Sequence, residues 1–152
     1  MKGKYDMTNT DYIKIEFTSR SVNESFARAT IAAFAARLDP TLEELADIKT
    51  AVSEAVTNCI VHAYPGVIGA IWLRARIIGD RTLEITVRDS GIGIPDVKKA
   101  REPMYTTGGD DRSGMGFTIM ESFMDKIKVR SAEGKGTSVT MTRRIIRRSL
   151  PV

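Results

Sequence analysis

Two pairs of segments alternate between apolar and polar side chains, and a short turn that contains glycine joins the members of each pair. AIWLRARII (70–78) and TLEITVRD (82–89) flank the turn GDR, while KIKVRS (126–131) and TSVTMTR (137–143) flank AEGKG. A period of two is typical of half-buried strands, and turns this short connect antiparallel neighbours. The chain is therefore predicted to build a largely antiparallel sheet.

A strand and a helix are predicted ahead of these hairpins. IKIEF (13–17) alternates in the same way, with its apolar residues on one face. The motif SVNE matches a capping box between Ser21 and Glu24, which predicts a helix from there to about Leu38.

A second helix is predicted directly after the first. Pro40 suits a first helical turn, and Thr41 with Glu44 matches a second capping box. The helical pattern continues to about Ala63. The apolar positions that form one stripe along this helix are Leu45, Ile48, Val52, Val56, Cys59 and Ala63.

Residues 90–116 are rich in glycine and show little periodicity, apart from a short helical pattern in DVKKARE (96–102). A segment of this length without regular structure in a compact domain is often a functional lid. From Gly116 the pattern becomes helical over FTIMESFMDKI, and its methionine-rich stripe is expected to face the core.

The predicted order is therefore strand, two helices, hairpin, lid, helix and hairpin. Two hairpins without a β-α-β series favour the α+β class, as a two-layer sandwich of a mixed, mostly antiparallel sheet with helices on one face. At 152 residues the chain fits a single domain, 1–152, in which 1–11 and 146–152 are expected to be flexible ends.

Composition argues against several classes of protein. No apolar run reaches the ~20 residues that span a membrane, and the N-terminus has no apolar signal-peptide segment. A single cysteine, Cys59, cannot form an internal disulfide, which fits the cytoplasm. The net charge is +4, and four of the arginines lie in the last ten residues, RRIIRRSLPV. The tail lacks a recognition motif for nucleic acid, so it is expected to be solvated and not bound to nucleic acid. Binding to an acidic protein partner is an alternative that the composition leaves.

The second predicted strand of the first hairpin ends on a carboxylate, Asp89, and Gly91 and Gly93 follow in DSGIGIP. Two glycines so close together indicate positive φ angles or a group that approaches the backbone. A turn would explain one of them, and a bound ligand would explain both together with the aspartate. The stretch lacks the third glycine of G-x-G-x-x-G, and no P-loop motif exists in the chain.

A second glycine pair, Gly114 and Gly116, flanks Met115 just before the last predicted helix. The N-terminus of a helix offers unpaired N–H groups and the positive end of a dipole, which suit a phosphate. The two glycine pairs could therefore hold the two ends of one nucleotide.

Glu54 and Asn58 lie four residues apart and point the same way from the long helix. Taken alone, they are best interpreted as a solvated helix face. Carboxylate and amide oxygens are, however, also the protein ligands that coordinate Mg²⁺ together with phosphates and waters.

Three motifs in this order, EAVTN, DSGIGIP and SGMGF, resemble the N box and the two glycine boxes of the gyrase, chaperone, histidine-kinase and mismatch-repair ATPases, which share the Bergerat-type ATP-binding fold. Within this superfamily, SVNESFAR, SEAVTNCIVHAY and RSGMGFTIMESFMD resemble the anti-sigma-F factors of sporulating bacteria, which are serine-protein kinases. The resemblance covers about residues 13–142. Each box alone is a weak signal, but three in order are specific.

The resemblance implies ATP and Mg²⁺ as cofactors. Asp89 would accept a hydrogen bond from the adenine amino group, and Thr137 would place a hydroxyl near the base, unless it is an ordinary strand residue. The backbone positions that would lie against the nucleotide are Gly91, Gly93, Gly114, Met115 and Gly116.

The resemblance also assigns the chemistry. Asn58 would supply an oxygen to Mg²⁺, and Glu54 would act as the general base that takes the proton of an incoming serine hydroxyl. Arg112 would meet the γ-phosphate and offset its charge in the transition state. The kinases of this family carry a lysine after the paired threonines, and the stretch TTGGDDRSG of this chain does not. The resemblance therefore does not say which contacts the lid makes with the nucleotide.

The function implied is that of an anti-sigma factor and serine kinase, which holds a sporulation sigma factor inactive and phosphorylates an anti-anti-sigma protein. Arg28 would contact both partners, although its spacing from Glu24 also fits a local salt bridge. A homodimer is expected, without direct contact to nucleic acid or membrane. The alternatives are a stress-response anti-sigma kinase, an ATPase module of a two-component or switch system, and a nucleotide-dependent binding module without kinase activity.

Overall fold

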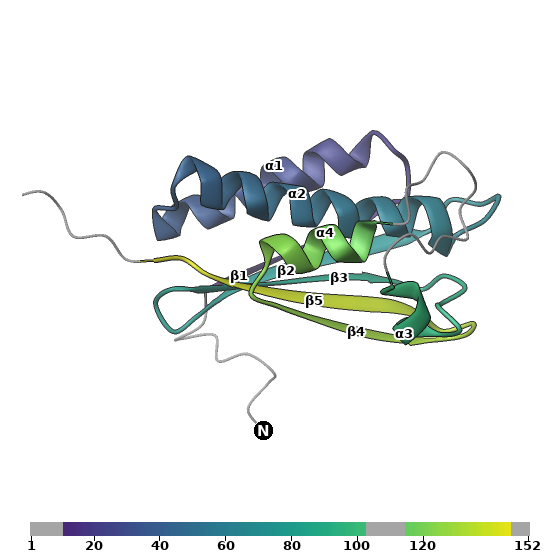
Figure 1. Cartoon of the computed structure of the whole chain (residues 1–152). Coiled ribbons are helices and arrows are strands. Elements are labelled where there is room, and N and C mark those ends of the chain that lie inside the picture. The colour runs from purple at the N-terminus through teal and green to yellow at the C-terminus, as the bar shows by residue number, and fades with distance from the viewer. Residues whose placement is uncertain (1–10, 103–114, 147–152) are drawn as a thin grey trace, which may run out of the picture.

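A five-stranded sheet with helices on one face forms the molecule (Figure 1). The computed structural model describes residues 11–102 and 115–146. The strands are β1 (Tyr12–Thr18), β2 (Ala70–Ile78), β3 (Thr82–Asp89), β4 (Lys126–Ala132) and β5 (Gly136–Arg144). They lie in the order β1-β2-β3-β5-β4, and all four pairings in the described part are antiparallel. The predicted α+β two-layer architecture is confirmed, with a sheet that is antiparallel throughout these pairings and not mixed.

The helices follow the predicted order. They are α1 (Asn23–Ala35), α2 (Leu42–Asn58), α3 (Val97–Ala100) and α4 (Gly116–Phe123). A 3-10 turn, η1 (Ala36–Leu38), extends α1, and a π-helix, η2 (Cys59–Ala63), extends α2. Figure 1 shows α1, α2 and α4 stacked over the same face of the sheet.

Capping explains where α2 begins. The Thr41 hydroxyl accepts a hydrogen bond from Glu44 N at 3.0 Å, and the Glu44 carboxylate accepts one from Thr41 N at 2.9 Å. This is the predicted capping box, which satisfies two of the backbone donors that every helix start leaves unpaired.

The capping box predicted for α1 is wrong. The helix begins at Asn23 after Val22, and no side chain caps it within the described residues. The Glu24 carboxylate turns instead toward α2, where it accepts a hydrogen bond from the Ser53 hydroxyl. A contact between two helices has therefore replaced the local one, and Glu24 N bonds to the Ser21 carbonyl in a backbone turn.

The core lies between the helices and the inner face of the sheet. Alternate residues of the central strands point inward, so that Leu73 of β2 sits opposite Val87 of β3, and Ala75 opposite Ile85. The large side chains that are fully buried include Ile31, Ile48, Val52, Val56, Ile71, Leu83, Met120 and Met141. Each contributes roughly 1.5–3 kcal/mol by leaving water, so this layer fixes where α2 and α4 sit above the sheet.

The outer face of the sheet is polar, as the alternation predicts. Arg76 of β2 donates to Glu84 of β3 at 2.8 Å, and the Arg88 guanidinium stacks on the Trp72 ring. In the described part of the chain, no helix has the length and apolar character needed to cross a bilayer.

Replacing Thr41 by alanine tests the cap of α2. Thr41→Ala should lower the free energy of unfolding by about 1 kcal/mol, because Glu44 N loses its acceptor. Thr50→Ala is the matched control, since Thr50 lies exposed inside the same helix and its hydroxyl donates to the Ala46 carbonyl of the preceding turn. Chemical denaturation of both variants gives the comparison, and equal losses would show that the box does not stabilise the helix start.

Candidate functional site

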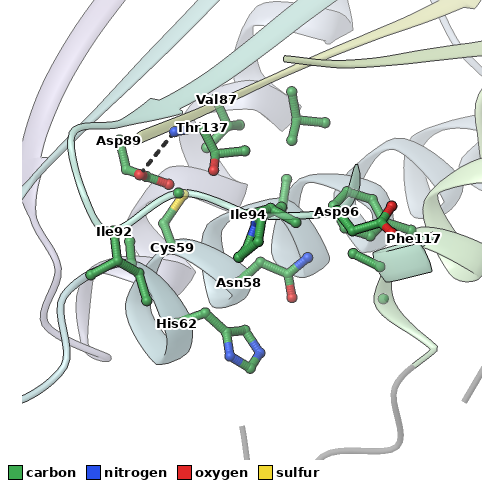
Figure 2. Close-up of a pocket in the computed structure, with 17 residues that line it drawn as sticks. Asn58, Cys59, His62, Val87, Asp89, Ile92, Ile94, Asp96, Phe117 and Thr137 are labelled. Atoms are coloured by element: carbon green, nitrogen blue, oxygen red, sulfur yellow. Dashed lines mark hydrogen bonds between the residues drawn. The ribbon is translucent and has the colours of Figure 1, made fainter. Parts of the chain in front are cut away.

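A pocket of about 310 Å³ opens between the helix layer and the loop that follows β3 (Figure 2). Its walls come from α2, η2, the ends of β3 and β5, residues 92–96 and the start of α4. Apolar side chains such as Val87, Ile94 and Phe117 make up most of the lining. Its polar side chains are Asn58, His62, Asp89, Asp96 and Thr137. Mostly apolar walls with a few placed polar groups are typical of small-molecule sites.

Asp89 stands at one end of this pocket, where β3 ends. It is only 5% exposed, and its Oδ1 accepts hydrogen bonds from Gly91 N at 3.0 Å and from Thr137 N at 3.2 Å. Figure 2 shows the carboxylate beside Thr137. The two backbone donors orient the carboxylate as an acceptor at the pocket wall.

Cys59 reaches Asp89 from the helix layer. Burial, the negative charge of Asp89 and a hydrogen bond to its side chain together raise the pKa of the Cys59 thiol well above its ordinary value. The thiol therefore stays protonated at neutral pH and donates to the carboxylate. Cys59 is a buried residue, as predicted, and its contact with Asp89 is a feature that the sequence pattern did not reveal.

The glycines after Asp89 have a cause inside the protein. Gly93 has a φ of +79°, and a Cβ there would lie 2.1 Å from the Ala132 carbonyl oxygen. A Cβ on Gly91 would lie 2.1 Å from the Ala63 carbonyl oxygen, which accepts a hydrogen bond from Ile92 N at 2.9 Å. The loop is thus held between η2 and the β4–β5 hairpin, and glycine is needed on both sides. Contact of these glycines with a ligand stays a prediction.

Tyr64 also supports the loop, and the sequence analysis missed it. Its hydroxyl accepts a hydrogen bond from Ser90 N at 2.7 Å and donates one to the Ala70 carbonyl at 2.5 Å. Burial raises the pKa of the Tyr64 hydroxyl above its ordinary value, so the group remains a donor at neutral pH. Tyr64 ends the segment SEAVTNCIVHAY, but its contact with Ser90, 26 residues along the chain, depends on the fold.

The other end of the site joins α2 to the start of α4. A Cβ placed on Gly116 would lie 3.3 Å from Glu54 Oε2 and 3.3 Å from the Asn58 amide. The structure therefore brings Glu54, Asn58 and Gly116 together, as the motif order predicts. Met115 is the N-cap residue of α4, and its own side chain makes no capping hydrogen bond. Backbone N–H groups at a helix start favour an anion.

The oxygens of Glu54 and Asn58 fit a Mg²⁺ ion whose other ligands are mainly phosphate oxygens. Mg²⁺ is typically bound by one or two protein oxygens and completes its octahedron with phosphate and water. Within residues 11–102 and 115–146, no group of three or more His, Cys, Asp and Glu side chains gathers as an all-protein metal site would require. The donor set thus suits an ion that arrives with a nucleotide.

Arg28 lies apart from the pocket, on α1. Its Nη1 is 3.1 Å from Glu24 Oε1 and 3.3 Å from Ser53 Oγ, so the local salt bridge expected from the spacing is present. The side chain is still 40% exposed. A role in partner binding stays a prediction. Arg112 and Gly114 lie outside the described residues, so their predicted roles stay predictions as well.

Comparison with known proteins agrees with this geometry. The model of the histidine kinase-like ATPase domain matches residues 16–143. An anti-sigma F factor of Caldanaerobacter subterraneus is 56% identical over 140 residues, which cover 91% of this chain and 97% of that protein. An anti-sigma F factor of Clostridium acetobutylicum is 56% identical over 133 residues, which cover 87% and 92% of the two chains.

Solved structures share the fold at lower identity. The RsbU and RsbW domains of a Mycobacterium tuberculosis protein align with a TM-score of 0.64 at 21% identity, over 89% of this chain and 32% of that one. The mycobacterial sensor histidine kinase MprB aligns with a TM-score of 0.57 at 14% identity, over 88% and 98%. With its pocket, its three motifs and these relatives, the chain belongs to the anti-sigma F factors within the histidine kinase-like ATPase domain family.

Proposed function

We propose that this protein binds ATP with Mg²⁺ in the pocket, phosphorylates a serine of an anti-anti-sigma protein, and holds a sporulation sigma factor inactive. One observation carries the proposal. The pocket has a buried, oriented carboxylate at one end and Asn58 at the other, where Gly116 brings the start of α4 close to both Asn58 and Glu54. A nucleotide needs both ends, a base site and a phosphate site.

The base end suits adenine. Asp89 presents acceptor oxygens there, and two backbone N–H groups hold its carboxylate in place. The adenine amino group is a donor, and the apolar walls at Val87 and Ile94 suit the faces of a purine ring. Gly93 keeps the loop in place along this wall.

The phosphate end suits the chemistry of phosphoryl transfer. The Mg²⁺–ATP complex supplies the phosphoryl group and neutralises its charge when bound, and Asn58 would hold the ion through its amide oxygen. Glu54 lies one helical turn before Asn58 and beside the N-terminus of α4. There it would take the proton from the serine hydroxyl as the serine oxygen bonds to the γ-phosphorus, while the bond from that phosphorus to the bridging oxygen breaks and ADP leaves. Gly114 and Arg112 would complete the phosphate contacts.

The partners follow from the family. Its members bear the name anti-sigma F factor, so the sigma factor of this chain would be of that type, bound in the cytoplasm. The exposed part of Arg28 would contact both the sigma factor and the anti-anti-sigma protein, which would make their binding mutually exclusive. A homodimer is part of the same proposal.

A direct experiment tests the kinase activity. The chain is incubated with labelled ATP, Mg²⁺ and the anti-anti-sigma protein encoded beside it, and the product is analysed for phosphoserine. Label on serine supports the proposal. Nucleotide binding without transfer would favour the alternative, a binding module in which nucleotide only sets the shape.

Asp89→Asn tests the base end. The asparagine oxygen would keep the hydrogen bonds from Gly91 N and Thr137 N, and its NH2 group would then face the adenine amino group, donor against donor. ADP and ATP should therefore both lose affinity, by roughly 1–3 kcal/mol. Calorimetric titration measures both nucleotides. Asp96→Asn is the control, because Asp96 lines the same pocket and its role of capping α3 is open to asparagine. Unchanged ADP affinity in folded Asp89→Asn protein would contradict the assignment.

Glu54→Ala separates binding from chemistry. We expect it to keep nucleotide and sigma-factor binding and to slow phosphate transfer by about two to four orders of magnitude, the usual share of a general base. Asn58→Ala should instead weaken Mg²⁺–ATP more than the nucleotide measured without Mg²⁺. Single-turnover rates and titrations with and without Mg²⁺ distinguish the two variants. Transfer at the parental rate in both would mean that this helix face is only solvated.

Arg28→Ala tests the partner surface. Arginine is often a hot spot of interfaces, so each complex should lose on the order of 2 kcal/mol of binding free energy. The salt bridge to Glu24 is worth only about 0.2–0.5 kcal/mol, so the melting temperature and the ATP affinity should hardly change. Arg37→Ala is a control on the same helical hairpin, with an exposed ion pair to Asp11. A lower melting temperature with parental affinity for both partners would leave Arg28 as a local contact.

A further inference from the structure

Ser131 lies on β4, in none of the three motifs, and its hydroxyl meets three polar groups. Ile94 N lies 2.7 Å from Ser131 Oγ, the Gly136 carbonyl oxygen 2.9 Å, and Thr137 Oγ1 2.8 Å. These contacts join the loop after β3 to the β4–β5 hairpin. They also decide which way the Thr137 hydroxyl points.

A hydroxyl has one proton and two lone pairs, so the three contacts allow one assignment. Ile94 N–H can only donate, and it takes one lone pair of Ser131 Oγ. The Gly136 carbonyl can only accept, and it takes the Ser131 proton. The remaining lone pair of Ser131 must therefore accept the proton of Thr137.

The Thr137 hydroxyl consequently acts only as a hydrogen-bond acceptor toward the pocket. Its hydroxyl proton points away to Ser131, while the side chain lines the pocket next to Asp89 (Figure 2). Asp89 also faces the pocket as an acceptor, since it takes hydrogen bonds from Gly91 N and Thr137 N. This end of the pocket therefore offers two acceptors and no side-chain donor from Asp89 or Thr137.

We infer that Ser131 is a specificity-determining residue: by fixing the Thr137 hydroxyl as an acceptor, it makes the pocket select a purine with an amino group at position 6 over one with an oxo group. The inference rests on the proposed function, in which this end of the pocket receives the base.

The selection follows from hydrogen-bond chemistry. With position 6 against the two acceptors, a 6-amino group presents N–H donors to them, whereas a 6-oxo group presents lone pairs to lone pairs. The 6-oxo base also carries a proton on N1, beside this position. A site that is built for a donor rejects the analogue without it, because its buried polar groups are left unpaired. Without Ser131 the Thr137 hydroxyl would be free to rotate and donate to the oxo group, so the rejection would weaken while Asp89 still favours the amino group.

The experiment compares ADP with inosine diphosphate, which differ at the base and share ribose and phosphates. Calorimetry gives both affinities for the parent, for Ser131→Ala and for Ser138→Ala, a control serine on the outer-face side of β5. We expect the parent to prefer ADP, Ser131→Ala to lower the ratio of the two affinities about tenfold, and Ser138→Ala to keep it. A purely structural role of Ser131 would weaken both nucleotides equally, and an unchanged ratio overturns the inference.

Thr137→Val gives a second and independent readout. This variant removes the hydroxyl, so it should also lower the ratio, and adding Ser131→Ala to it should change the ratio no further. If Ser131→Ala does not fold, a parental ratio in Thr137→Val overturns the inference by itself. A parent that binds neither nucleotide would refute the proposed function, whereas a parent that prefers ADP with an unchanged ratio in the variants would refute only the role of Ser131.

Discussion

Two backbone carbonyl oxygens, one from η2 and one from β4, pack closely against the loop after β3. The geometry of the base end depends on these two contacts. Ala63 at the end of η2 approaches Gly91, and Ala132 at the end of β4 approaches Gly93, each so closely that a Cβ would collide. The loop therefore has one position relative to the helix layer and the hairpin. That position sets where Asp89 stands and how the pocket wall at Ile94 is formed.

The same contact couples the two ends of the pocket. The helix that carries Glu54 and Asn58 continues into the π-helix η2, whose last carbonyl touches Gly91. A shift of this helix along its axis would move the phosphate end and the base end together. The π-helix η2 also lines the pocket, and π-turns are frequent at functional sites.

Much of the fold could be predicted from local pattern. The strands 70–78 and 82–89 were predicted with the bounds that the structure shows, because alternation and a tight turn both act within a few residues. The box of Thr41 is confirmed for the same reason. The box of Ser21 failed because Glu24 found a partner on another helix, which no local rule can anticipate.

The site residues show the same difference between those that local motifs predict and those that depend on contacts made in the fold. Motif order predicted that Glu54 and Asn58 would meet Gly116, and the structure brings them together. Tyr64 and Ser131, which support the base end, were missed because the contacts with Ser90 and Ile94 that tie them to the loop join segments distant in the chain. The sequence predicted positive φ angles or a close approach to the backbone at the two glycines after Asp89. The structure shows a positive φ at Gly93 and a close backbone approach at both, while contact with a ligand stays a prediction.

The hydrogen bonding of this loop also bears on how it should exchange its amide protons. Although 91–94 has no regular structure, Gly91 N, Ile92 N and Ile94 N all donate inside the protein, to Asp89, Ala63 and Ser131. Irregular loops normally exchange fast because water reaches their amides. Here deuterium should enter these three amides at rates closer to those of a strand, even before any ligand is added. The entropic cost of ordering this loop is thus met when the chain folds, and a base that enters the pocket has little left to order there.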